Sequence, residues 1–103
     1  MDEVEKLNEL VWAVVAAIPQ GCVRTYGDVA SLIGFPSHAR YVGSVLKKLP
    51  KGTALPWHRV VNAKGEISFP EGSDGYLRQK CLLEKEGIVF VGKKLSLKTY
   101  RAD

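Results

Sequence analysis

The first 18 residues place apolar side chains at three- and four-residue steps, the spacing that aligns them along one side of a helix. The positions in this stripe are Val4, Leu7, Val11, Val14 and Ile18. The sequence Pro19-Gln20-Gly21 interrupts the pattern, since Pro and Gly both disfavour continuation of a helix. A first helix is therefore predicted over about residues 4–18.

A second, shorter helix is predicted over about residues 26–33. Thr25 and Asp28 have the spacing of a capping pair, in which the hydroxyl accepts backbone N–H groups and the helix dipole favours the carboxylate. Gly34 can adopt the left-handed conformation that often ends a helix. These two signals indicate both ends of the element.

Ser37 is the predicted N-cap of a third helix. The apolar stripe of this helix consists of Val42, Val45, Leu46 and Leu49. It ends before Pro50, because the residue preceding a proline is disfavoured in the helical conformation. Together with the Gly-x-Pro turn at 34–36, the two short helices indicate a helix-turn-helix over about residues 25–49, a pattern that also occurs in proteins that never meet DNA.

From residue 51 to residue 68, Pro, Gly and β-branched residues replace the helical pattern. Val60-Val61 and Ile67 flank the turn-like segment 62–65, so this region is predicted to be a small hairpin or an irregular loop.

The C-terminal third changes pattern three times. Residues 70–75 are predicted to be a flexible connector, and a fourth helix is predicted over about 76–86, ending at Gly87. The apolar stripe of this helix consists of Leu77, Cys81 and Leu82. Residues 88–91 have the composition of a strand, and the tail 93–103 is basic with few apolar residues.

The chain has 103 residues, of which 46% are hydrophobic and 25% charged, as is typical of one small folded domain. No repeat or linker divides it, so residues 1–103 are predicted to form a single domain, mainly α with a small β hairpin (an α+β fold). Fifteen Lys and Arg against 11 Asp and Glu give a formal net charge of +4. This excess suits a polyanionic partner, although many solvated surfaces carry it.

Cys22 and Cys81 belong to no Cys-x-x-Cys motif or Cys/His cluster, so neither a metal site nor a disulfide framework is predicted. Both are expected to be small buried apolar residues in a reducing compartment. The acidic N-terminus lacks the basic start and apolar core of a signal peptide, and no run reaches about 18 apolar residues. We therefore expect a cytoplasmic protein, associated with the nucleoid in a bacterium, without membrane contact.

The polar side of the predicted third helix carries Arg40, Ser44 and Lys47, with Gly43 beside them. Small residues let a helix approach a nucleic-acid groove, while Arg can reach bases and Lys can neutralise phosphates. The same spacing is common on solvated helix faces. Taken alone, it favours the ordinary surface over a DNA-binding face.

Four ordered motifs resemble the DNA-binding domain of the O6-alkylguanine-DNA alkyltransferases, at closely similar spacing over about residues 7–91. The motifs are Ile18-Pro19-x-Gly21-x-Val23-x-Thr25-Tyr26-Gly27-Asp28-Val29-Ala30, Gly34-x-Pro36, Ala39-Arg40-x-Val42-Gly43 and Pro56-x-His58-Arg59-Val60. The resemblance implies a winged-helix-like domain whose third helix enters the minor groove of duplex DNA.

Trp57 stands where that family carries its nucleophilic cysteine. A thiolate at this position accepts an alkyl group from a damaged base, whereas an indole has no thiolate and donates a single N–H. The exchange is typical of the alkyltransferase-like proteins and implies that no residue here is catalytic. Trp57 either lines a pocket for the damaged base or fills a pocket that is no longer used.

The resemblance also implies that Tyr26 and Arg40 contact DNA. In the family, the tyrosine crowds a phosphate and helps to rotate the target nucleotide, and the arginine occupies the space that the flipped base leaves. Taken alone, Tyr26 could equally pack under a turn and Arg40 could form a weak surface ion pair. The DNA-binding residues expected from the helix face and the resemblance are Tyr26, Arg40, Gly43, Ser44 and Lys47.

His58 and Glu86 correspond to the family's relay to the catalytic cysteine. Without a thiol they are expected to be structural, and Arg59 is expected to make buried hydrogen bonds that hold the loop. The expected lesion pocket consists of Tyr26, Trp57, His58, Arg59, Val60 and Ser68, together with parts of 67–76. The sequence departs from the transferase pattern at two places: Leu49 stands in place of an asparagine, and the 69–76 connector is longer. The residues that form this part of the pocket wall are therefore not predicted.

These observations predict a monomeric, non-enzymatic damage sensor with no cofactor and no metal. It would bind double-stranded DNA containing O6-alkylguanine, flip the damaged base into the pocket and flag it for nucleotide excision repair proteins. Two other classes stay open: an alkyl-accepting repair enzyme whose nucleophile has moved to Cys22 or Cys81, and a helix-turn-helix transcriptional regulator that reads undamaged sequence.

Overall fold

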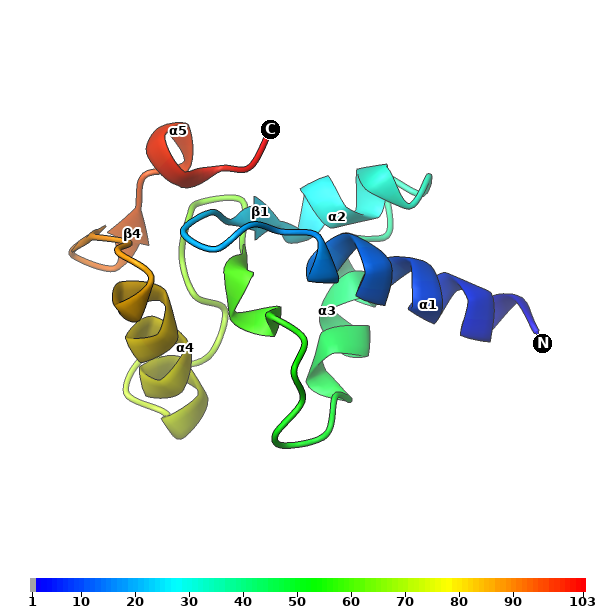
Figure 1. Ribbon diagram of the computed structural model, residues 1–103, viewed down its shortest axis with the longest axis horizontal. Coiled ribbons are helices and arrows are strands. Elements are labelled where there is room, and N and C mark those ends of the chain that lie inside the picture. Colours follow the sequence, from blue (N-terminus) through cyan, green and yellow to red (C-terminus); the bar gives the residue numbers. More distant parts are fainter. Residues whose placement is uncertain (1) are drawn as a thin grey trace.

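Helix α1 (Glu3–Ala16) is the long first element of the structure, a computed structural model that describes residues 2–103 (Figure 1). It confirms the first predicted helix, with Val11 buried in the helix and Ile18 buried just after it. Val4 is 60% exposed, contrary to the predicted stripe, because the first turn of α1 extends beyond the rest of the molecule. None of the helices in the described part of the chain is long and apolar enough to cross a membrane.

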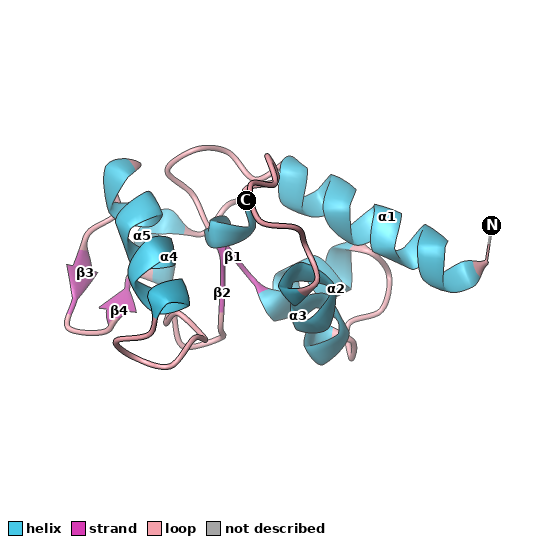
Figure 2. Ribbon diagram, turned by 90° about the horizontal axis from the view of Figure 1, so that it is seen from below, coloured by secondary structure: helices cyan, strands magenta, loops and turns pink. Residues whose placement is uncertain are grey.

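Helices α2 (Tyr26–Leu32) and α3 (Ala39–Lys47) pack against each other and against α1 (Figure 2). The predicted capping pair is confirmed. The Thr25 hydroxyl accepts a hydrogen bond from the Asp28 N–H at 3.0 Å, and the Asp28 carboxylate accepts one from the Thr25 N–H at 3.0 Å. Gly34 has a φ of +90°, so it ends the helix region in the left-handed conformation, as predicted.

The N-cap prediction for α3 is wrong. His38 occupies the N-cap position, and its side chain makes no capping hydrogen bond. The Ser37 hydroxyl lies 3.2 Å from Nδ1 of His38, so it is engaged by its neighbour instead of the helix backbone. Val42 and Val45 of the predicted stripe are buried.

Strand β2 (Val60–Val61) lies between two hydrophobic clusters. It pairs in parallel with β1 (Arg24–Thr25). Successive residues of a strand point to opposite faces. Val60 therefore packs into the cluster formed by α1, α2 and α3, while Val61 packs into a second cluster that includes Leu83. This short strand pair joins the N-terminal helices to the C-terminal half of the chain.

Of the two predictions for the segment after β2, the irregular loop is confirmed and the hairpin is wrong. The turn at 62–65 forms, but β2 pairs with β1 and not with the residues after the turn. The antiparallel hairpin instead joins β3 (Phe90–Val91) to β4 (Lys94–Leu95). A backbone N–H of β4 donates to the Gly65 carbonyl at 3.0 Å, so the turn is tied to the C-terminal hairpin.

Helix α4 (Asp74–Lys85) confirms the fourth predicted helix but buries a different face. It begins before the predicted start, because the Ser73 hydroxyl accepts a hydrogen bond from the Tyr76 N–H at 3.2 Å and caps the helix. Leu77 is 56% exposed, and Cys81 is exposed as well. The buried positions of α4 are Tyr76, Gln79 and Leu83. The apolar pattern missed this face because a polar side chain occupies its centre.

The C-terminal tail is part of the folded structure, which its basic and thinly apolar composition did not predict. Helix α5 (Leu97–Tyr100) follows β4, and the chain then returns to β1. The backbone of Val23 donates one hydrogen bond to the tail and accepts another, each at 2.8 Å. The Arg101 guanidinium donates to both oxygens of Asp28, at 2.9 and 3.0 Å. The C-terminus therefore lies beside the start of α2 (Figure 1).

Candidate functional site

A cavity of about 620 Å³ lies between α2, α3 and the segment 57–70. Most of the residues expected in a nucleic-acid interface or a base pocket share its walls. These are Tyr26, Arg40, Gly43, Ser44, Lys47, Trp57 and Ser68. Two sets that the sequence suggested separately, a DNA-binding face and a base pocket, thus meet around one cavity.

Three residues of the expected pocket do not line this cavity. Val60 is only 1% exposed and belongs to the core of the N-terminal helices. His58 and Arg59 point to Glu86 on the other side of the segment. Trp57, His58 and Arg59 form a single 3-10 turn, η1 (Trp57–Arg59), and consecutive side chains of such a turn project in different directions.

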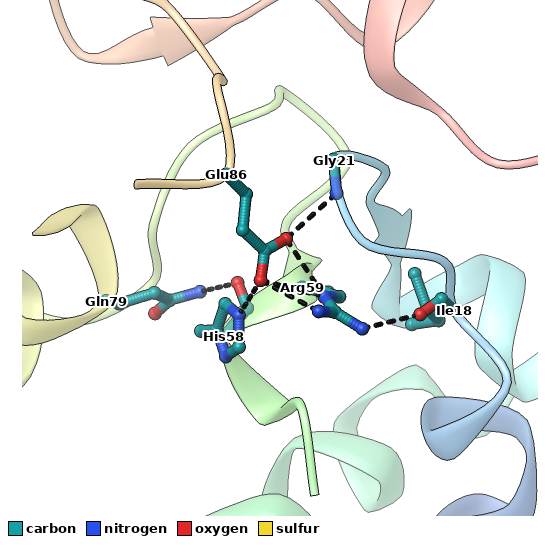
Figure 3. Close-up of polar contacts among 6 residues, drawn as sticks. All are labelled: Ile18, Gly21, His58, Arg59, Gln79 and Glu86. Carbon is teal, nitrogen blue, oxygen red and sulfur yellow. Dashed lines mark hydrogen bonds and ion pairs between the residues drawn. The ribbon is translucent and has the colours of Figure 1, made fainter. Parts of the chain in front are cut away.

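Glu86 accepts hydrogen bonds from three residues in two segments, the 3-10 turn and the loop after α1 (Figure 3). Its carboxylate is 2.7 Å from Nε2 of His58, and it accepts from Arg59 at 2.8 and 3.0 Å and from the Gly21 N–H at 3.0 Å. Arg59 also donates to the Ile18 carbonyl at 2.8 Å. Glu86 therefore links the C-terminal end of α4, the 3-10 turn and the loop after α1, and the expected buried hydrogen bonds of Arg59 are confirmed.

The electrostatics of this network keep Glu86 ionised. Burial raises the pKa of the carboxyl, but the hydrogen bonds from Arg59, from the Gly21 N–H and from His58 outweigh burial and lower the pKa to about 2. A carboxylate that is charged throughout the physiological range can act here as a permanent acceptor. Its position accords with the structural role expected for His58 and Glu86.

Gln79 is a second anchor of the 3-10 turn, and sequence reasoning missed it. Its side chain is almost fully buried and donates to the carbonyls of His58 at 3.0 Å and Val60 at 2.9 Å. A buried amide that satisfies two carbonyls fixes the backbone on both sides of the turn. The available signal was a glutamine lying three residues after Tyr76 and four before Leu83, both buried on α4.

Trp57 is held between aromatic neighbours at the edge of the cavity. Its ring lies 6.1 Å from the ring of His58 and 6.2 Å from that of Phe69, with edge-to-face angles of 88° and 85°. Phe69 was not predicted as a site residue. A side chain at Gly75 would meet the Phe69 ring at 2.7 Å, so the glycine leaves the space that Phe69 occupies.

The opposite wall of the cavity is formed by α2 and α3. Tyr26, the first residue of α2, is half-buried, and its ring would lie 3.8 Å from a Cβ at Gly43. Arg40 is exposed, and within residues 2–103 it forms no ion pair that would hold it to the protein surface. Among residues 2–103, Arg40 and Lys47 are the charged residues of the wall, and none of the wall residues is Asp or Glu. The cavity therefore presents a positive field and aromatic edges, a combination suited to an anionic, aromatic ligand.

Neither cysteine lies on the cavity wall. Cys22 is half-buried and Cys81 is exposed, so the expectation that both are buried is wrong. Cys81 is exposed because it lies outside the buried face of α4, which contains Gln79. Among the described residues, no group of three or more His, Cys, Asp or Glu could hold a metal ion.

Comparisons with known proteins point to one family. Residues 6–88 match the family model described as 6-O-methylguanine DNA methyltransferase, DNA binding domain. The chain is 50% identical to the Escherichia coli K12 "DNA base-flipping protein" over 98% of this chain and 78% of that protein. It is 49% identical to the Schizosaccharomyces pombe "Alkyltransferase-like protein 1" over 76% of this chain and 72% of the relative.

The fold is similar to that of a solved complex. The crystal structure of S. pombe Atl1 with damaged DNA containing O6-carboxymethylguanine superposes with a TM-score of 0.88. The two chains are 40% identical, and the match covers 100% of this chain and 99% of the other. The similarity therefore includes the C-terminal tail, which lies beyond the segment matched by the family model.

Proposed function

This chain belongs to the family of the 6-O-methylguanine DNA methyltransferase DNA-binding domain, and within it to the alkyltransferase-like proteins, and we propose from this that it is a non-enzymatic sensor of alkylated DNA. It binds duplex DNA through α2 and α3, turns O6-alkylguanine out of the helix into the cavity and holds it there. The names of the E. coli base-flipping protein and of the S. pombe complex support both parts of this proposal.

The observation that carries the proposal is the composition of the cavity wall. Arg40, Lys47 and Tyr26 lie on the wall built from the helix pair, and Trp57 lies on the wall built from the 57–70 segment. A duplex docked on α3 would bring a rotated nucleotide to the mouth of the cavity. The volume of the cavity, about 620 Å³, lies in the range of about 300–1,000 Å³ typical of small-molecule sites.

The free-energy cost of base flipping sets how much stabilisation these residues must give to the flipped base. Extruding a base costs a few kcal/mol, and less for a poorly paired alkylated base. A contact between a base and an aromatic ring contributes about 1–3 kcal/mol, and Trp57 and Tyr26 offer two such rings. Arg40 adds to this by occupying the space that the flipped base leaves. These contributions are large enough to hold a damaged base outside the duplex.

Alkyl transfer does not follow binding in this proposal. Trp57 donates one N–H and has no thiolate, and neither Cys22 nor Cys81 lies on the cavity wall. The bound base keeps its alkyl group, so its removal requires another activity. We therefore propose that the complex flags the lesion for nucleotide excision repair proteins, and that the sensor acts as a monomer in the cytoplasm, at the nucleoid of a bacterium.

The test is a pair of binding titrations in which fluorescence anisotropy reports the fraction of DNA bound. Two duplexes of the same sequence carry either O6-methylguanine or guanine at one position, at the same ionic strength, because phosphate contacts make affinity depend on salt. The proposal predicts tighter binding of the damaged duplex by about tenfold or more. Equal dissociation constants would refute the sensor and favour a regulator that reads undamaged sequence.

The variants Lys47→Ala and Lys48→Ala separate a specific contact from general charge. Both residues are exposed and adjacent, but only Lys47 lines the cavity. Lys47→Ala should weaken binding to both duplexes more than Lys48→Ala does. Intact-mass measurement of the incubated protein tests the enzyme alternative, since an added methyl group on either cysteine would contradict the non-enzymatic assignment.

A further inference from the structure

The C-terminal tail adds a third chain segment to the β1–β2 pair. Val23, which directly precedes β1, forms a parallel bridge with Arg101. The Val23 N–H donates to the Tyr100 carbonyl and the Val23 carbonyl accepts from the Ala102 N–H, each at 2.8 Å. Because β1 also pairs with β2, it lies between β2 and the tail.

Both walls of the cavity start from these paired segments. Tyr26 directly follows β1 and begins α2, whereas Trp57 lies in the 3-10 turn that leads into β2. Helix α2 has only 7 residues, and a helix this short depends on contacts outside itself for its stability. The contacts at the start of α2 therefore set where the Tyr26 side chain stands relative to Trp57.

Arg101 of the tail holds the start of α2. Its guanidinium donates to both oxygens of the Asp28 carboxylate, at 2.9 and 3.0 Å. The same carboxylate accepts the Thr25 N–H at 3.0 Å and closes the capping box of α2. The side chains of Arg101 and Asp28 are 48% and 23% exposed. A bidentate pair at the surface fixes geometry more than it adds stability.

We propose that Arg101 is a positioning residue for base flipping. Through Asp28 it fixes the first turn of α2, and with it Tyr26, in the orientation that rotates the damaged nucleotide. The inference rests on the proposed function, because it requires Tyr26 to act on DNA. Arg101 itself does not line the cavity. Loss of the pair should weaken binding of the lesion, which needs a rotated nucleotide, and spare binding of undamaged duplex, which needs phosphate contacts.

A direct contact between Arg101 and a DNA phosphate is the other role that this exposed cation could have. The geometry favours positioning, because Asp28 already engages Nε and Nη2 of the guanidinium. A phosphate contact would act on every duplex, and removing the negative charge of Asp28 would strengthen it. In the positioning role, Asp28→Asn and Arg101→Gln break the same pair, so both should weaken lesion binding and their effects should not add.

The test measures dissociation constants for the O6-methylguanine and guanine duplexes by anisotropy. The proteins are the wild type, Arg101→Gln, Asp28→Asn and the double variant. Each single variant should bind the damaged duplex about threefold to fivefold more weakly and the guanine duplex within about twofold of the wild type. A change of about fivefold corresponds to about 1 kcal/mol, the upper end for an exposed ion pair. The double variant should match the single variants.

Three further variants separate this role from charge and from stability. Arg101→Lys keeps the charge but loses the planar fork, so it should bind the lesion between wild type and Arg101→Gln. Lys98→Gln removes a positive charge from an exposed residue of the tail that forms no ion pair within residues 2–103, and it should keep the preference for damaged duplex. Gly92→Ala strains the β3–β4 hairpin, because φ is +64°, and it should lower stability without changing the preference.

Two results would overturn the inference. One is a preference for the damaged duplex that Arg101→Gln leaves intact. The other is equal weakening of both duplexes by Arg101→Gln, with a smaller salt dependence and with tighter binding by Asp28→Asn, which would assign Arg101 to a phosphate. If the wild type itself binds both duplexes equally well, the sensor fails and the inference fails with it, so the failure of each is recognisable.

Discussion

Replacing Glu86 with glutamine tests the network that holds the 3-10 turn. The substitution keeps the size of the side chain and one carbonyl oxygen but removes the negative charge. It also places an NH2 group against donors from His58 and Arg59. The variant should therefore lose the charge-assisted hydrogen bonds of this site while keeping its volume.

The pKa of Glu86 gives the magnitude. The carboxyl titrates at about 2 in the folded protein, against an ordinary value of 4.5. At about 1.36 kcal/mol for each pH unit, this difference stabilises the folded protein by about 3 kcal/mol. Because the folded pKa is the lower one, the contribution is present above pH 4.5 and is lost as the pH falls toward 2. At pH 3 less than half of this contribution should remain.

Urea unfolding, monitored by circular dichroism, measures this contribution. The free energy of unfolding of Glu86→Gln should be about 3 kcal/mol below that of the wild type at pH 7. This difference in stability should become smaller at pH 3. Glu84→Gln, at an exposed position of the same helix, should change stability by less than about 0.5 kcal/mol. A loss below 1 kcal/mol at pH 7, or a loss that does not shrink on acidification, would refute the reasoning.

Three further substitutions, the last with a matched control, test other parts of the account. Arg40→Ala should weaken binding to an O6-methylguanine duplex by about 5- to 150-fold, corresponding to about 1–3 kcal/mol; unchanged affinity in a titration would remove its role in holding the flipped state. Gln79→Leu should lower the free energy of unfolding by about 2–4 kcal/mol, since it leaves two carbonyls of the segment 58–60 without their buried donor. Gly65→Ala should cost at least about 2 kcal/mol in urea unfolding, because φ is +77° and the new Cβ would lie 2.6 Å from a carbonyl oxygen of β4. Gly72→Ala, with φ at +83° and open space around it, should cost less, and equal losses would contradict the steric argument.

The helices could be predicted from the sequence because their signals are local. The apolar steps of α1 and α3, and the capping pair of Thr25 and Asp28, lie within one or two helical turns. The strand pairs could not be predicted in the same way. The partner of β2 is β1, far away in the chain, and the tail packs on Val23 through backbone hydrogen bonds that leave no pattern in the sequence.

The candidate site shows the same division. The order of the four motifs, which encode a shared fold, predicted the position of Trp57. It also predicted that Trp57 lies near Tyr26 and Arg40. The expected pocket also took in residues 58–60, because they adjoin Trp57 in sequence. The 3-10 turn directs His58 and Arg59 toward Glu86, and Val60, in β2, packs into the core. Phe69, from the segment after the 62–65 turn, lines the cavity beside Trp57 instead.

Gln79 was missed for a physical reason. Helix periodicity treats a glutamine as a solvent-facing residue, so the predicted stripe moved to Leu77 and Cys81. The buried position becomes favourable only when two carbonyls of another segment are present to accept its hydrogens. A polar residue at a helical step between buried positions is the sequence signal of such a contact.

The most direct test of the central claim is a crystal structure of this chain bound to duplex DNA with a single O6-methylguanine. The account predicts the damaged base outside the duplex, in the cavity between Tyr26 and Trp57, with Arg40 in the space it left and the methyl group still on O6. A base that remains stacked in the duplex would contradict the base-flipping claim. A methyl group found on a cysteine of the protein would contradict the claim that the sensor performs no chemistry.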